Sequence, residues 1–116
     1  MRPYSRKLAT VLVAAGACVV FSAKVALASP AYTAAAPIVT LNPREYGVDV
    51  YVPQSNNPMN CATPGWFRLK IDAQNYNGIL SFILVRYASQ ATIEFYTASC
   101  DTVDGFSIIV AAKDHG

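Results

Sequence analysis

The chain has 116 residues, of which 53% are hydrophobic, and a formal net charge of +2. Four of its nine basic residues lie within the first 24 positions, so the remainder has five basic and seven acidic residues and a net charge of −2. A nucleic-acid-binding domain of this size normally carries a basic stripe. This distribution therefore predicts that nucleic acid is not a partner.

The N-terminal segment has the order of a secretory signal. Basic residues in the first seven positions precede an apolar run over 8–21, and small residues at 26 and 28 suit a signal peptidase. The sequence therefore predicts a signal over residues 1–28 and export from a bacterium, to the periplasm or the medium. Lys24 interrupts the apolar run before it reaches the roughly 20 residues that span a membrane, so no membrane anchor is expected after cleavage. A lipidated Cys18 is an alternative, but the branched apolar residue usual three positions before such a cysteine is absent.

The 88 residues after the predicted cleavage point suffice for one small domain. Residues 29–37, SPAYTAAAP, predict a flexible lead-in, and residues 38–113 predict the domain itself. Two cysteines remain after cleavage, Cys61 and Cys100, and an oxidising compartment would pair them in a single way. Closing a loop of about 40 residues would stabilise the fold by roughly 4 kcal/mol. A redox-active pair would favour C-x-x-C spacing, which is absent, so a structural disulfide is predicted.

Alternating residues predict the strands in the first half of the domain. A short β-prone run covers 38–41, and turn residues follow it. Over 48–52 and again over 66–72, apolar residues alternate with other types at the period of a half-buried strand. Between these two strands, residues 53–65 contain three prolines and no periodicity, which predicts a long surface loop.

A change of period then predicts one helix over 76–89. Its expected apolar face comprises Tyr76, Ile79, Leu80, Ile83, Leu84 and Tyr87. Asp72 or Asn75 could cap its start. Alternation returns over 92–97, and a turn precedes a last strand over 106–112. The residues expected to be buried between helix and sheet are Leu80, Ile83, Leu84 and Phe95.

The predicted order is three strands, one helix and two strands. A mainly β fold with one helix after the third of five strands is the arrangement of an OB-like five-stranded Greek-key barrel, with the helix closing one end. An α+β sandwich of three layers is the alternative, because the number of strands constrains barrel closure only weakly.

Three segments resemble a group of small secreted bacterial proteins. Residues 61–69 read CATPGWFRL, residues 76–89 end in Tyr-Ala-Ser, and residues 92–96 read TIEFY shortly before Cys100. This order of cysteine, strand, helix, strand and cysteine is similar to the B subunits of subtilase-cytotoxin and pertussis-like toxins, over roughly residues 48–112. The resemblance implies an OB fold, a homo-oligomer and glycan binding. It carries over no glycan-contacting residue to a numbered position of this chain.

The sequence lacks the residues that most enzymes and metal sites need. His115 is the only histidine and lies one residue from the C-terminus, where chain ends are usually mobile. Asp101 and Asp104 flank a turn, a place where aspartate is common because it bonds to the backbone. No G-x-S-x-G, phosphate-loop or dinucleotide motif occurs. We therefore expect a protein that is not an enzyme, with no catalytic residue, cofactor or metal.

Aromatic side chains provide the candidate binding surface, which consists of Trp66, Tyr96, Tyr51 and Asn57 beside the loop 53–65. Trp66 and Tyr96 have the outward parity of their strands, and rings of this kind combine an apolar body with a polar handle. A glycan or another protein is the expected ligand. One alternative is that these rings only cover the sheet. Another is that the chain is a structural or interaction protein, or an inhibitor, of the cell envelope with no small ligand.

Overall fold

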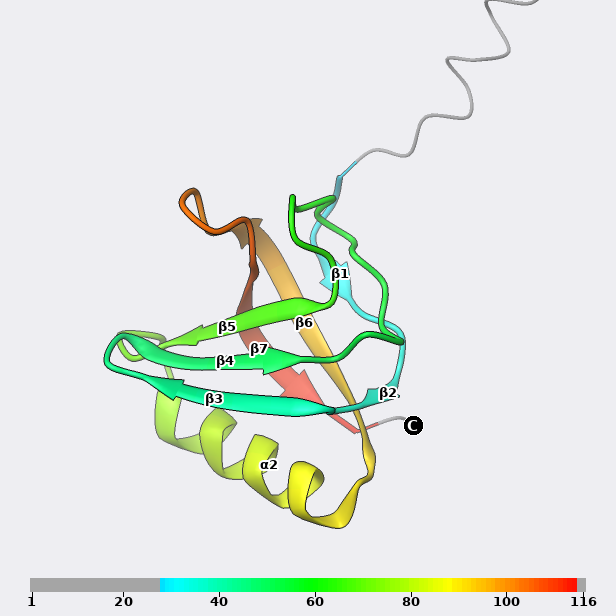
Figure 1. Ribbon diagram of the computed structural model, residues 1–116, viewed down its shortest axis with the longest axis vertical. Helices are drawn as coiled ribbons and strands as arrows, with labels where there is room; N and C mark the ends of the chain where they lie inside the picture. The colour runs from blue at the N-terminus through cyan, green and yellow to red at the C-terminus, as the bar shows by residue number, and fades with distance from the viewer. Residues whose placement is uncertain (1–27, 115–116) are drawn as a thin grey trace, which may run out of the picture.

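The computed structural model describes residues 28–114 (Figure 1). The predicted signal up to residue 27, which includes Cys18, and the histidine at position 115 lie outside the described residues. The elements are β1 (Ala31–Tyr32), β2 (Ala36–Pro37), β3 (Thr40–Arg44), β4 (Gly47–Tyr51), β5 (Trp66–Lys70), α2 (Tyr76–Ser89), β6 (Thr92–Cys100) and β7 (Ser107–Lys113). The expectation of a mainly β fold with one helix is thus confirmed. No helix of the described part is long and apolar enough to cross a membrane.

The observed order of elements differs from the predicted one, because two short strands, β1 and β2, precede the others. The strand predicted over 38–41 overlaps β3 only at Thr40 and Leu41, and β3 continues to Arg44 through residues for which the sequence predicts a turn. The helix has its predicted bounds, whereas β6 continues beyond the predicted end at 97 as far as Cys100. Local periodicity locates most of these elements correctly, but the two short strands carry no periodic signal.

All the strands belong to one sheet, in the order β1-β6-β7-β5-β4-β3, with β2 paired to β6 off this path. Neighbouring strands are antiparallel except for β5 and β7, which are parallel. Residues 36–44 pass from β2, which pairs with β6, to β3, which pairs with β4. In Figure 1, β3, β4 and β5 cross the direction of β6 and β7, and α2 lies beyond β3.

Alternate residues of the strands form the hydrophobic core. The buried apolar residues include Val48, Val50, Val52, Phe67, Leu69, Ile93, Phe95 and Ile109 from the sheet, with Ile79 and Ile83 from α2. The rings of Phe67 and Phe95 lie 5.1 Å apart between their centroids. Since successive side chains of a strand point to opposite faces, this core leaves the intervening residues of β4 and β5 on the outer face. That outer face contains the candidate site.

The buried side of α2 is narrower than the sequence predicts. Ile79 and Ile83 are buried, and partial packing against the core involves Tyr76, Leu80 and Phe82. The predicted burial of Ile83 and Phe95 is confirmed, but that of Leu84 is wrong, because Leu84 is 46% exposed. At 3.6 residues per turn, Leu84 lies about 140° around the helix from Ile79. It therefore points away from the sheet.

Both ends of α2 have a residue with left-handed backbone. Asn75 occupies the N-cap position with φ 60°, but its side chain makes no capping hydrogen bond, and Asp72 does not cap the helix either. Gln90 follows the last turn with φ 57°. The N–H of Gln90 donates to the carbonyl of Tyr87, which satisfies one of the carbonyls left open at a helix end.

Residues 29–37, for which the sequence predicts a flexible lead-in, pair with the sheet instead. β1 and β2 are both antiparallel to β6. Between them Thr33 is buried, and its N–H donates to the carbonyl of Phe95 at 2.8 Å while its hydroxyl accepts from the N–H of Phe95 at 3.0 Å. Since alanine and proline are depleted in strands and the segment shows no alternation, only tertiary pairing identifies it as part of the fold.

Candidate functional site

The antiparallel register of β4 and β5 places three residue pairs side by side on the outer face of the sheet. Tyr51 is opposite Trp66, and Asp49 is opposite Arg68. The third pair joins Gly47, the first residue of β4, with Lys70, the last residue of β5. Side chains opposite each other on one face lie within about 5.5 Å at their Cβ atoms, so aromatic and charged groups adjoin here.

Three aromatic rings, from Tyr51, Trp66 and Phe106, stack across the outer face, and we call them the aromatic row. Tyr51 and Trp66 lie 4.8 Å apart between ring centroids with an interplanar angle of 25°. Trp66 and Phe106 lie 5.4 Å apart with an angle of 20°. The sequence predicted Tyr51 and Trp66 together, and the structure brings them together. It did not predict Phe106, because that ring comes from the chain just before β7.

Arg68 is buried at the centre of a group of polar side chains beside the aromatic row. We call these residues, Arg68 with Tyr46, Asp49, Asp101 and Asp104, the Arg68 group. Its Nε donates to Asp49 Oδ1 at 2.8 Å, and Nη2 donates to Asp104 Oδ2 at 2.8 Å and to the Tyr46 hydroxyl at 3.0 Å. Its Nη1 lies 3.2 Å from Asp101 Oδ2. The hydrogen bond to Asp49 is the main cause that raises the pKa of Arg68 above its usual value. Arg68 therefore stays charged and joins β4, the turn before it and the β6–β7 loop.

The Arg68 guanidinium also lies between two rings. Its central carbon is 4.3 Å from the centroid of Tyr46 and 4.6 Å from that of Phe106. A cation above an aromatic face is attracted by the ring quadrupole. Burial, and then a hydrogen bond to Asp49, raise the pKa of the Tyr46 hydroxyl, so Tyr46 remains a neutral donor to that carboxylate.

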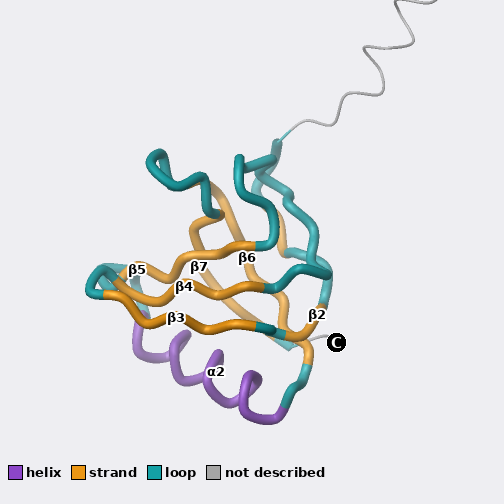
Figure 2. The backbone as a smooth tube through the Cα atoms, in the orientation of Figure 1, coloured by secondary structure: helices purple, strands orange, loops and turns teal. Residues whose placement is uncertain are grey.

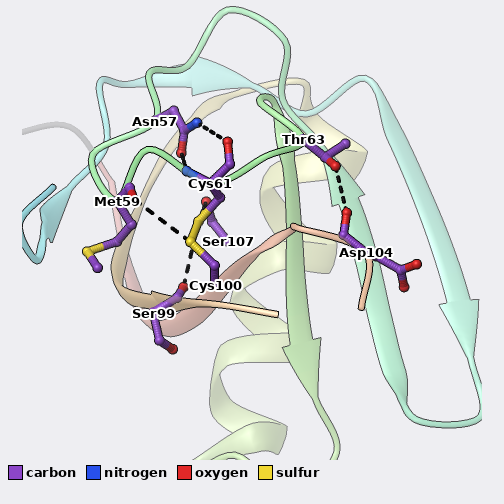
Figure 3. The surroundings of a disulfide bond; sticks show 8 residues. All are labelled: Asn57, Met59, Cys61, Thr63, Ser99, Cys100, Asp104 and Ser107. Atoms are coloured by element: carbon purple, nitrogen blue, oxygen red, sulfur yellow. Dashed lines mark hydrogen bonds between the residues drawn. A yellow bond between two sulfur atoms is a disulfide. The ribbon is translucent and has the colours of Figure 1, made fainter. Parts of the chain in front are cut away.

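A disulfide and two loops form the border of this face (Figure 3). Cys61 and Cys100 are bonded, with 5.6 Å between their Cα atoms, so the predicted pairing is confirmed. The loop after β4 and the β6–β7 loop then contact each other directly. The hydroxyl and the N–H of Thr63 donate to the carbonyls of Asp104 and Gly105. Figure 2 shows both loops projecting at the same end of the sheet.

Asn57 has a structural role in the first of these loops. Its Nδ2 donates to the carbonyl of Cys61 at 2.8 Å, and its Oδ1 accepts from the N–H of Cys61 at 3.0 Å (Figure 3). These two bonds hold the loop against the disulfide and occupy both ends of the amide.

Tyr96 lies apart from the other predicted residues. It is in β6, opposite Ala111 of β7, and its ring meets that of Tyr32 edge to face at 5.2 Å. β7 separates β6 from β5 in the sheet, and β5 pairs with the opposite end of β7. Trp66 and Tyr96 therefore share an outward parity but do not adjoin.

An open hollow of about 330 Å³ adjoins the Arg68 group. It is lined by Tyr46, Arg68, Lys70, Asp101, Val103 and Asp104. Within the described residues, the Lys70 ammonium and Asp104 Oδ1 make no hydrogen bond or ion pair. The hollow thus combines the Tyr46 ring and the apolar side chain of Val103 with a free donor, the Lys70 ammonium, and a free acceptor, Asp104 Oδ1. A few convergent polar groups in a partly apolar hollow are typical of a ligand site.

Asp101 and Asp104 belong to the turn that the sequence predicts. Asp101 Oδ2 accepts from the backbone N–H groups of Val103 and Asp104, at 3.0 and 2.8 Å. These bonds, that of Asp104 first, lower the pKa of Asp101. Among the residues that the structure describes, no group of three histidine, cysteine, aspartate or glutamate side chains could hold a metal ion.

Comparisons of the chain with protein-family models, curated proteins and solved structures found no match.

Proposed function

We propose that this chain is an exported, non-enzymatic binding module that recognises a glycan with the outer face of β4 and β5. The observation that carries the proposal is the aromatic row beside a hollow that contains a free donor and a free acceptor. Apolar pockets with a small number of placed polar groups are the usual form of small-ligand sites. The resemblance to toxin B subunits agrees with this proposal.

An OB-like barrel is part of the same proposal. The helix follows the third of the five longer strands, and β5 and β7 are the parallel pair. Residues 36–44 pair with β6 at one end and with β4 at the other, which would connect the two halves of a curved sheet. These features support closure of the sheet by β2 and β3.

Export is supported by the order of residues in the first 28 positions and by the disulfide. Disulfides persist in oxidising compartments and are rare where thiols are kept reduced. Mass measurement of secreted or periplasmic material should give an N-terminus at Ser29. A retained Lys7 or a lipid on Cys18 would contradict this.

A protein partner in place of a glycan is the second candidate, as for a structural or interaction protein of the envelope. The observation that favours it is the outer side of α2, where Leu84, Val85 and Tyr87 are exposed. Apolar patches of this kind often mark protein contacts. In that case the purified protein would bind no immobilised glycan.

The deciding experiment is a screen of the purified protein against immobilised glycans, followed by the variants Trp66→Ala and Tyr96→Ala. If the aromatic row takes part in binding, Trp66→Ala weakens glycan binding and Tyr96→Ala does not. Loss of binding in Tyr96→Ala alone would place the ligand on β6 and contradict the proposed face. Quenching of Trp66 fluorescence by iodide, relieved by a bound glycan, gives an independent readout.

A further inference from the structure

We infer that the ligand is a neutral sugar whose ring stacks on Tyr46 in the hollow beside Arg68, an inference that rests on the proposed function. Trp66 is the ring that the sequence favours, but it has Tyr51 on one side and Phe106 on the other. A ring with neighbours on both sides offers its edge to a ligand. Tyr46 contacts the Arg68 guanidinium, no other described ring stacks on it, and it is 37% exposed.

Hydrogen bonds hold the Tyr46 ring in place before any ligand arrives. Its hydroxyl donates to Asp49 Oδ2 at 2.8 Å and accepts from Arg68 Nη2 at 3.0 Å. Its backbone carbonyl accepts from the N–H of Ile71 at 2.8 Å. An aromatic side chain loses little conformational entropy on binding, and one already fixed by its partners loses less. Arg68 is thus a positioning residue for the Tyr46 ring.

The hollow also contains groups that suit sugar hydroxyls. Hydroxyls donate and accept hydrogen bonds, and the hollow provides the free Oδ1 of Asp104 as acceptor and the Lys70 ammonium as donor. The side chain of Asp104 is 47% exposed, so Oδ1 is accessible. Val103 at the tip of the loop is 86% exposed and offers an apolar contact to the C–H groups of a sugar.

The charges around the hollow favour a neutral sugar over an acidic one. Asp101 and Asp104 line it, and the donors of Arg68 are taken up by Asp49, Tyr46 and these two carboxylates. The Lys70 ammonium is the one cation of the lining that makes no hydrogen bond or ion pair with the described residues, and its charge already acts on Asp101. A carboxylate on the ligand would lie beside like charges, which disfavours binding.

The test uses the purified protein and immobilised glycans that end in a neutral hexose, an N-acetylhexosamine, a sialic acid or a uronic acid. The best neutral sugar is then titrated in solution by calorimetry. We expect neutral ends to be preferred and Tyr46→Ala to weaken binding at least tenfold. The matched control is Tyr32→Ala, because Tyr32 is 38% exposed and lies on β1, away from the hollow.

Tyr46→Ala also removes hydrogen bonds of the Arg68 group, so circular dichroism must confirm that this variant folds. Lys70→Met therefore provides a second variant. The Lys70 ammonium makes no hydrogen bond or ion pair within the described residues and acts on Asp101 only through its charge, so its loss should leave the fold intact and weaken binding several-fold. If glycan binding persists unchanged in both variants, or if acidic sugars are preferred, the inference is wrong while the proposed function stands. If no glycan binds, the proposed function is wrong and the inference with it.

Discussion

Arg68 and Asp49 face each other from neighbouring strands, with 2.8 Å between Nε and Oδ1, and both side chains are at least 94% buried. Both have the outward parity of their strands, so they would be solvent-exposed if nothing covered the sheet. The β6–β7 loop and Tyr46 cover them. The ion pair therefore fixes between β4 and β5 the guanidinium that holds Tyr46 and the β6–β7 loop at the candidate site.

Replacing Arg68 by methionine should strongly destabilise the protein, because it leaves Asp49 buried without its main partner. Breaking a buried ion pair by removing one partner costs about 3–5 kcal/mol. The double variant Arg68→Met/Asp49→Asn should recover much of this loss, since position 49 then carries no unpaired buried charge. The measurement is the free energy of unfolding in urea. The control is Arg44→Met, because Arg44 lies 3.5 Å from the same carboxylate but is 53% exposed. Such a pair contributes about 0–1 kcal/mol, and equal losses in both variants would contradict the assignment.

Stability should fall in acid through Asp101. Its pKa in the folded protein is below the ordinary value of 3.8, so the charged form stabilises the fold above that pH. This stabilisation is lost as the pH falls through the lowered pKa. Asp101→Asn should be less stable than the original protein at pH 7 and should show a smaller loss between pH 5 and pH 2, in urea unfolding at each pH. Asp72→Asn, at an exposed position, is the control. If Asp101→Asn and the original protein lose the same unfolding free energy between pH 5 and pH 2, the prediction is wrong.

Removing the disulfide should cost about 2–5 kcal/mol, as is usual for small secreted domains. The variant is Cys61→Ala with Cys100→Ala, which leaves no unpaired thiol behind, and unfolding in urea gives the loss. Cys61 and Cys100 of the native protein should also remain unlabelled by a thiol-reactive reagent until a reductant is added. Labelling of both positions without reductant would mean that the bond is not formed.

Two adjacent residues of α2 provide a test of the helix orientation. Ile83→Ala should cost about 2–5 kcal/mol, since Ile83 is fully buried, whereas Leu84→Ala should cost far less because it leaves no enclosed cavity. The change in unfolding free energy measures both. A larger loss for Leu84→Ala would mean that Leu84, and not Ile83, faces the sheet.

The sequence by itself located β4 to β7, the helix and the disulfide, whereas the first predicted strand overlaps β3 only in part. The valines of 48–52 and the apolar residues of 66–70 alternate with a period of two, and a local period requires no knowledge of the rest of the chain. The pairing of Cys61 with Cys100 followed from the count of cysteines left after the predicted cleavage. The sequence included Tyr51 and Trp66 in one candidate surface, and the structure stacks their rings from adjacent strands.

Only the tertiary structure decided which outward residues are covered and which are free. Parity states that Arg68, Trp66 and Tyr96 point away from the core, but not what lies above them. The β6–β7 loop brings Phe106 against Trp66 and Asp104 against Arg68, and the strand order separates Tyr96 from both. These contacts join residues about 40 positions apart, or strands that are not neighbours in sequence. Their energies depend on burial and on the surrounding chain, so no local pattern encodes them.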